Sequence, residues 1–198
     1  KWQRPFDRFE PQTIALFHFD EGAGYFSYGQ NRSSDQAYEL QFDLQGESWA
    51  SGPDPNFGSA LDFQSGSTGT KALTTENGYD DVDLLGISGG DGTIEFWLKL
   101  DSCPENQEPI TMCTGGSVSW QLSIRSDGQL KYAHKDLSSN WAGGFTSDEM
   151  ILPGQWRHVA LVREITVSDA EPQRCSMDIA FYIDGEKTSE NSLQDALL

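Results

Sequence analysis

Two short clusters of carboxylates are the residues of this sequence best suited to bind a metal ion. Asp20 and Glu21 precede Gly22 at the end of an alternating apolar stretch, and a second cluster lies at residues 80–83 (DDVD). Carboxylate oxygens beside a glycine turn suit a hard cation such as Ca²⁺. Asp and Gly are also ordinary turn residues, so solvated turns are the alternative for both clusters, and the favoured one for residues 80–83. A structural calcium at Asp20 and Glu21 is the single cofactor that we consider.

Three aromatic residues could bind a sugar ring. Trp141 lies in a stretch rich in small residues, 138–145 (SSNWAGGF), which we interpret as a loop. An exposed indole there could stack on a sugar while its N–H finds a polar partner. The alternative is a tryptophan that anchors the loop at the edge of the fold. Tyr79 and Tyr132 are weaker candidates for the same role.

The sequence contains no motif that arranges residues for catalysis. A retaining glycosidase needs two carboxylates about 5 Å apart, yet Glu95 is the only acid in its stretch, 93–100, and the stretch 118–125 contains none. The sequence has no Gly-x-Ser-x-Gly motif and no phosphate-binding glycine loop. His158 and Trp156 stand at the start of an apolar stretch, where a structural role is favoured. We therefore expect no enzymatic activity, with a polysaccharide-degrading enzyme as the remote alternative.

The charge of the chain limits its partners. It has 13 basic and 31 acidic residues among 198, a net charge of −18. Such a field repels nucleic acid and anionic lipid surfaces, and no apolar run is long enough to cross a membrane. We expect a glycan or protein ligand, no nucleic acid and no membrane insertion. An extracellular, periplasmic or cell-surface location fits this acidity.

Three cysteines offer at most one disulfide. Cys103 and Cys113 flank a segment that we interpret as a loop and could bridge it, whereas Cys175 is distant in sequence. Free buried thiols are the alternative. The triplet Asn31-Arg32-Ser33 matches an N-glycosylation acceptor, a short pattern that is common by chance.

The pattern along the chain is that of strands. Apolar residues alternate with polar ones between turn-forming residues, which predicts a series of short antiparallel strands. The predicted strands are residues 13–20, 38–44, 60–63, 93–100, 118–125, 130–134, 156–163 and 177–183. Asp127-Gly128 and Asp184-Gly185 predict hairpin turns, and residues 21–50 outside 38–44, together with residues 164–175, are expected to be loops.

Such strands must close as two packed antiparallel sheets or as a barrel. We expect a single all-β domain over residues 1–198. The expected core residues are Phe17, Phe19, Phe96, Leu98, Trp120, Leu122, Val159, Leu161, Phe181 and Ile183.

Five segments, taken in order, resemble the laminin-G-like group of the concanavalin A-like lectin/glucanase superfamily. They are ALFHFDEGAG (15–24), FGSALDF (57–63), TIEFWLKL (93–100), PGQWRHVALV (153–162) and YIDG (182–185). The resemblance implies a two-sheet antiparallel jelly-roll sandwich, with one concave and one convex sheet. It also supports the calcium at Asp20 and Glu21, because many members hold calcium near such a turn.

Members usually continue past the last of these motifs into a strand that pairs with the first one. We therefore expect the strand at residues 14–19 to gain a neighbour from residues 2–9, from a further segment of the protein or from another chain. The function expected is a non-catalytic binding module within a larger secreted or surface protein. Carbohydrate is the favoured ligand, and protein–protein interaction or adhesion is the alternative.

Overall fold

The computed structural model divides the chain into two compact units, residues 1–85 and residues 86–198, which are described separately. The residues that the structure describes are 15–17, 22–23, 26–31, 39–43, 48–55, 57–62, 74–75, 91–102, 107–114, 117–135, 141–167 and 175–196.

The first unit contains two small antiparallel sheets. One has the order β1-β2-β3-β6, and the other pairs β4 with β5. Their bounds are β1 (Ala15–Phe17), β2 (Phe26–Asn31), β3 (Glu39–Asp43), β4 (Ser48–Ser51), β5 (Ser59–Asp62) and β6 (Thr74–Thr75). The predicted strand at 38–44 is confirmed as β3. The prediction of loops elsewhere in 21–50 is wrong for β2 and β4, whose Gly, Ser and Gln residues interrupt the apolar alternation.

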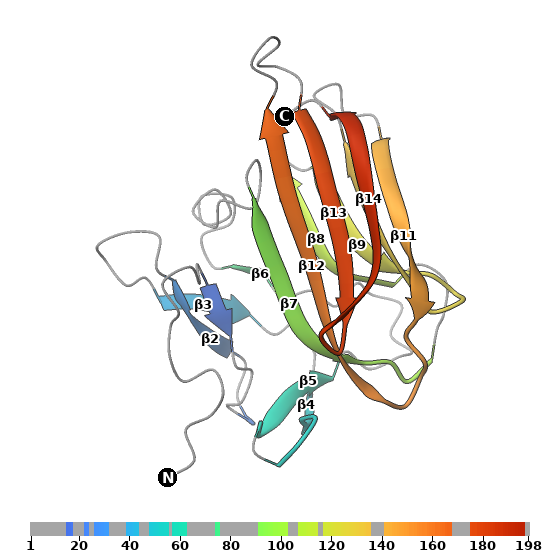
Figure 1. Ribbon diagram of the computed structural model, residues 1–198. Helices are drawn as coiled ribbons and strands as arrows, with labels where there is room; N and C mark the ends of the chain where they lie inside the picture. Colours follow the sequence, from blue (N-terminus) through green and yellow to red (C-terminus); the bar gives the residue numbers. More distant parts are fainter. Residues whose placement is uncertain are drawn as a thin grey trace. The chain divides into compact units, whose positions relative to one another are not determined.

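Two four-stranded antiparallel sheets form the second unit. The first sheet has the order β11-β10-β9-β8 and the second has the order β14-β13-β12-β7. The first comprises β8 (Gln107–Thr114), β9 (Ser117–Ile124), β10 (Gln129–Lys135) and β11 (Trp141–Met150). The second comprises β7 (Gly92–Lys99), β12 (Trp156–Val167), β13 (Cys175–Ile183) and β14 (Glu186–Ala196). Figure 1 shows them as two layers.

The two layers pack face to face, which confirms the predicted sandwich. Phe145 of β11 stacks on Phe181 of β13 with ring centroids 4.8 Å apart. Six predicted core residues are buried: Trp120, Leu122, Val159, Leu161, Phe181 and Ile183. Phe96 and Leu98 are half-buried, and the side chains of Phe17 and Phe19 lie outside the described residues.

Both predicted hairpins are present, with different turns. Asp184 and Gly185 have φ values of 52° and 84°, so they form a two-residue turn that needs positive φ at both positions. At the other hairpin only Gly128 takes a positive φ, 86°. Its N–H binds the carbonyl of Arg125 and the N–H of Arg125 binds the carbonyl of Gln129. The loop is therefore residues 126–128, one residue longer than the predicted Asp127-Gly128 turn.

Three predicted loops contain strand residues. Residues 107–114 of the supposed loop between Cys103 and Cys113 form β8, where Pro109 is tolerated because it lies on an edge strand at a register shift. The bond between these cysteines stays a prediction. Residues 164–167 extend β12.

The supposed loop around Trp141 is the third, because Trp141 begins β11 and pairs with Lys135. Gly143 and Gly144 interrupt the alternation of apolar residues in this strand, so the sequence did not show it. A Cβ at Gly144 would collide with the carbonyl oxygen of Tyr132, so the close pairing of β11 with β10 requires glycine at this position.

The first strand has a partner on one side. β1 pairs with β2, through Ala15 to Phe17, and stands at the end of its sheet among the described residues. Residues 2–9 lie outside them, so a strand supplied to the other side of β1 stays a prediction.

Tyr132 lies in the core between the two sheets. Its side chain is 1% exposed, it stacks near Trp120, and its hydroxyl donates to Met177 Sδ at 3.7 Å. Burial raises the pKa of Tyr132 above the ordinary 10.0, and the nearby buried Arg163 opposes part of this rise.

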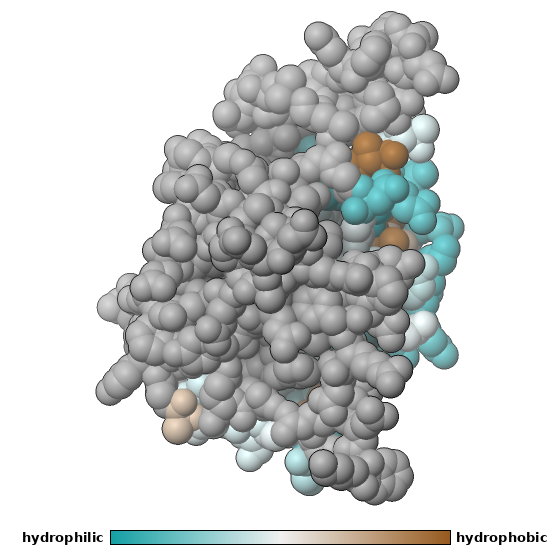
Figure 2. All heavy atoms as spheres, turned by 90° about the vertical axis from the view of Figure 1, so that its left-hand side faces the viewer, coloured by the Kyte–Doolittle hydropathy of each residue, from teal (hydrophilic) through white to brown (hydrophobic). Residues whose placement is uncertain are grey.

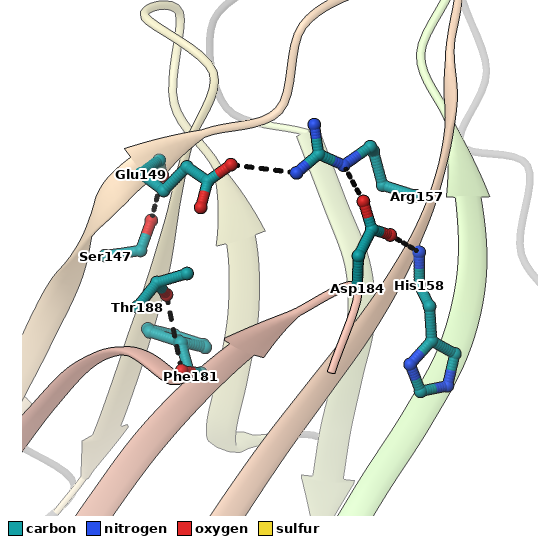
Figure 3. A network of polar contacts seen from close by, with 7 residues as sticks. All are labelled: Ser147, Glu149, Arg157, His158, Phe181, Asp184 and Thr188. Carbon is teal, nitrogen blue, oxygen red and sulfur yellow. Dashed lines mark hydrogen bonds and ion pairs between the residues drawn. The ribbon is translucent and has the colours of Figure 1, made fainter. Parts of the chain in front are cut away.

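A guanidinium joins the sheets at one end of the sandwich (Figure 3). Arg157, at the start of β12, places Nη2 2.8 Å from Glu149 Oε1 of β11. Its Nε lies 2.7 Å from Asp184 Oδ2 in the β13–β14 turn. The other carboxylate oxygen of Asp184 accepts the N–H of His158 at 2.9 Å. We call Glu149, Arg157 and Asp184 the arginine clamp.

The raised pKa of Tyr132 predicts a loss of stability in alkali. Because the unfolded phenol ionises near 10 and the folded one does so only at higher pH, stability is fully present below pH 10 and is lost as the pH rises toward the folded pKa. Tyr132→Phe should remove this component. Urea unfolding of both proteins from neutral to alkaline pH tests this prediction. If the free energy of unfolding fell equally with pH in the parent and in Tyr132→Phe, the pKa shift would be contradicted.

Removing the clamp should destabilise the second unit. Arg157→Met leaves two carboxylates without their cation, and because the Arg157 side chain is only 19% exposed, we expect a loss of about 1–2 kcal/mol, between surface and buried ion pairs. Lys187→Met breaks the exposed pair of Lys187 with Glu190 and is the matched control, expected to cost far less. Urea unfolding measures both, and equal losses would show that the clamp is an ordinary surface pair.

Candidate functional site

The structure separates the predicted site residues rather than gathering them. Tyr132 is buried in the core, and a platform for a sugar ring needs an exposed face, so we leave Tyr132 out of the proposed site. Trp141 lies at the start of β11, but its side chain is outside the described part of the chain. Tyr79 falls outside it too.

The predicted calcium ligands, Asp20 and Glu21, are likewise outside the described residues, and the calcium stays a prediction. Within the residues that the structure does describe, no group of three or more His, Cys, Asp or Glu side chains could hold a metal ion. Nor does this part of the chain contain a helix long and apolar enough to cross a membrane.

The outer face of the second sheet carries the clearest candidate site. Along β7, the residues Ile94, Phe96 and Leu98 turn toward the core, while exposed residues alternate with them. Trp97 is one of these and is 39% exposed. A large aromatic side chain on the solvent side of a strand has no role in the core, so it is available to a ligand.

Trp97 belongs to a cluster of three side chains on β7 and β12. Its cross-strand partner is His158, and the two ring centroids are 5.3 Å apart with an interplanar angle of 59°. His158 Nε2 lies 3.7 Å from Glu95 Oε2. The imidazole thereby connects the indole to a carboxylate that is about half exposed. We call Trp97, His158 and Glu95 the outer-face cluster.

The backbone under this cluster is held in place. The N–H of His158 binds the Asp184 carboxylate, and the carbonyl of His158 accepts the N–H of Asp184 at 2.8 Å. Figure 3 shows His158 pointing away from Arg157, on the opposite side of β12. The main chain of His158 is therefore fixed by two hydrogen bonds, and its ring lies beside Trp97.

The outer face continues across the sheet beside the cluster. Glu95 pairs with Ala160, and Ala160 pairs with Tyr182 of β13. Ala160 contributes only a methyl group, so it forms a low floor between Glu95 and the half-buried Tyr182. Strands are about 4.8 Å apart, which places the two aromatic positions, on β7 and β13, about 10 Å apart across the sheet.

A salt bridge borders this face on β14. Lys187 pairs with Tyr182 in the register, and its Nζ lies 2.7 Å from Glu190 Oε2. The hydrogen bond that Lys187 donates to Glu190, followed by the negative charge of Glu190, raises the pKa of Lys187. The face thus combines two aromatic side chains with carboxylates and a cation that can bind hydroxyl groups.

Sequence reasoning gives His158 a structural role and overlooks Trp97 as a ligand candidate. The signal for Trp97 is present: the alternation in 93–100 places it opposite the apolar Phe96 and Leu98. The cross-strand contact with His158 could not be read, because it depends on the register between β7 and β12.

Comparison with known proteins gives one match. No curated protein and no solved structure matches the chain. A family model described as "Concanavalin A-like lectin/glucanases superfamily", of the laminin-G-like type, matches residues 67–198, more than half of the chain. That region includes every strand of the two-sheet sandwich and the outer-face cluster. The chain therefore belongs to the concanavalin A-like lectin/glucanase superfamily.

Proposed function

We propose that this protein is a non-catalytic, extracellular carbohydrate-binding module whose outer-face cluster contacts the glycan. The observation that carries the proposal is the exposed Trp97 beside His158, with the Glu95 carboxylate at the edge. Family membership supports a binding module, and the cluster supports carbohydrate as its ligand.

The chemistry of the cluster suits a sugar. The flat indole of Trp97 can pack on the C–H face of a pyranose ring, while Glu95 and His158 accept or donate hydrogen bonds to hydroxyl groups at its rim. Sites of this kind combine an apolar surface with a few polar groups that set orientation. Because all three side chains stand on paired strands, binding requires little ordering of the main chain.

Charge favours a neutral glycan over an anionic one. The chain has a net charge of −18, and Glu95 would face the ligand directly, so sulfated or uronic acid polymers would be repelled. Figure 2 shows one face of the molecule on which the visible described residues are mostly hydrophilic, with apolar residues in small groups.

Hydrolysis is not part of the proposal. Glu95 and Asp178 are the only acids in β7 and β13, and they belong to strands separated by β12. A retaining glycosidase holds its two carboxylates about 5 Å apart, whereas two strand spacings are about 10 Å. Glu95 of the outer-face cluster is therefore too far from Asp178 for paired acid–base chemistry. The closer carboxylate pair, Glu164 and Asp178, is opposite in the β12–β13 register and lies six residues along β12 from His158, away from the cluster.

Removal of the indole tests the proposed site. Trp97→Ala should weaken binding to a neutral polysaccharide found by glycan-array screening at least about tenfold, a loss of 1.4 kcal/mol. Thr93→Ala alters an exposed residue of the same strand and is the matched control, expected to bind as the parent does. Calorimetric titration measures all three proteins. Equal affinities of Trp97→Ala and the parent would rule out the outer-face cluster.

Calcium at Asp20 and Glu21 has its own test. A cation that binds only the folded chain raises the melting temperature by mass action. We expect a higher melting temperature with excess calcium than with chelator, and Asp20→Asn with Glu21→Gln should abolish the difference. A parent protein that melts at the same temperature in both conditions would refute this calcium site.

A further inference from the structure

A second exposed apolar surface lies where the chain crosses from one sheet to the other. Met150 ends β11 and is 47% exposed, and Leu152 is 54% exposed. Ile151 between them is fully buried, so the two exposed side chains leave the chain on the same, outward side. With Trp97 they are the three large hydrophobic side chains exposed in the described part of the chain. We call Met150 and Leu152 the crossover pair.

The crossover pair is held rigidly. Between its two residues, the N–H of Ile151 binds the carbonyl of Gly128 at 2.8 Å, and beyond them the N–H of Gly154 binds the carbonyl of Leu100 at 2.7 Å. In the arginine clamp, Glu149 before the crossover pairs with Arg157 after it, so the two ends of this segment are connected (Figure 3). Because the backbone is already fixed, a partner that covers these side chains has to order only the side chains and not the main chain.

The surroundings of the pair are acidic. Asp148 and Glu149 directly precede Met150, and the exposed Asp101 follows Leu100, which anchors the crossover. Within the described residues, neither Asp101 nor Asp148 has an ion-pair partner among the salt bridges. The charge of Glu149 is paired with Arg157, which leaves the exposed Asp101 and Asp148. Exposed apolar side chains with such carboxylates near them along the chain are complementary to a partner that carries apolar and basic side chains together.

We propose that the crossover pair docks a basic polypeptide segment of another protein, through Lys or Arg side chains to Asp101 and Asp148 and aliphatic or aromatic side chains to Met150 and Leu152. A second copy of this chain is a poor occupant, since its own net charge is −18. The same field disfavours an anionic lipid surface. The proposal does not rest on carbohydrate binding, because the outer-face cluster uses other side chains.

A labelled synthetic peptide containing Lys and Leu tests the proposal by fluorescence anisotropy on the full chain. Two comparison peptides separate the contributions: in one Ser replaces Leu, and in the other Glu replaces Lys. We expect saturable binding of the Lys/Leu peptide, weaker at high salt, and at least about tenfold weaker binding of either comparison peptide.

Variants locate the binding. Met150→Ser with Leu152→Ser should weaken the Lys/Leu peptide at least about tenfold, and Asp101→Asn with Asp148→Asn should weaken it several-fold and reduce its salt dependence. Trp97→Ala is the control, expected to bind the peptide as the parent does, and all variants change exposed residues, so unaltered melting curves should accompany them. Equal binding by the parent and the Met150/Leu152 variant would overturn the proposal. A dimer seen by sedimentation and lost in that variant would overturn it too, in favour of a second copy.

Discussion

The alternation of side chains along paired strands is the constraint on which this structure depends. Once Val159 and Leu161 are buried against the other sheet, the residues that alternate with them along β12 must point to the opposite face of their own sheet. The same rule acts on β7, and the antiparallel register then places Trp97 beside His158. The outer-face cluster is thus a by-product of core formation, and a slip of one residue in either strand would bury it.

The start of β12 serves two sides of the sheet with two consecutive residues. Arg157 turns toward the other sheet and binds Glu149, whereas His158 turns outward to Trp97. Both depend on Asp184, which binds the guanidinium and the main-chain N–H of His158. The outer-face cluster and the crossover between the sheets therefore share a short piece of main chain, although the ligands proposed for them would contact different side chains.

The alternation in the sequence predicted the strands in which it is clean, because burial of one face leaves a period-two pattern. The resemblance to the laminin-G-like group then favoured the sandwich over a barrel. Sequence reasoning missed β8 and β11, where Pro109 and Gly144 interrupt that pattern for reasons of pairing geometry. It also proposed Tyr132 as a surface platform, since an alternating strand does not reveal which of its faces is covered. Predicting the outer-face cluster would have required the register between β7 and β12, which are distant in sequence. That register is set by packing in the folded protein.

The turn at Asp184 has a consequence for the variation that this position can tolerate. Its residue must adopt a φ of 52°, must accept a hydrogen bond and must carry a negative charge for Arg157. Asparagine keeps the first two properties and loses the charge; glycine keeps only the first; glutamate keeps the charge on a longer side chain that is less suited to positive φ. One nucleotide change in an aspartate codon can produce each of these three residues, and each of them loses at least one property that the turn uses.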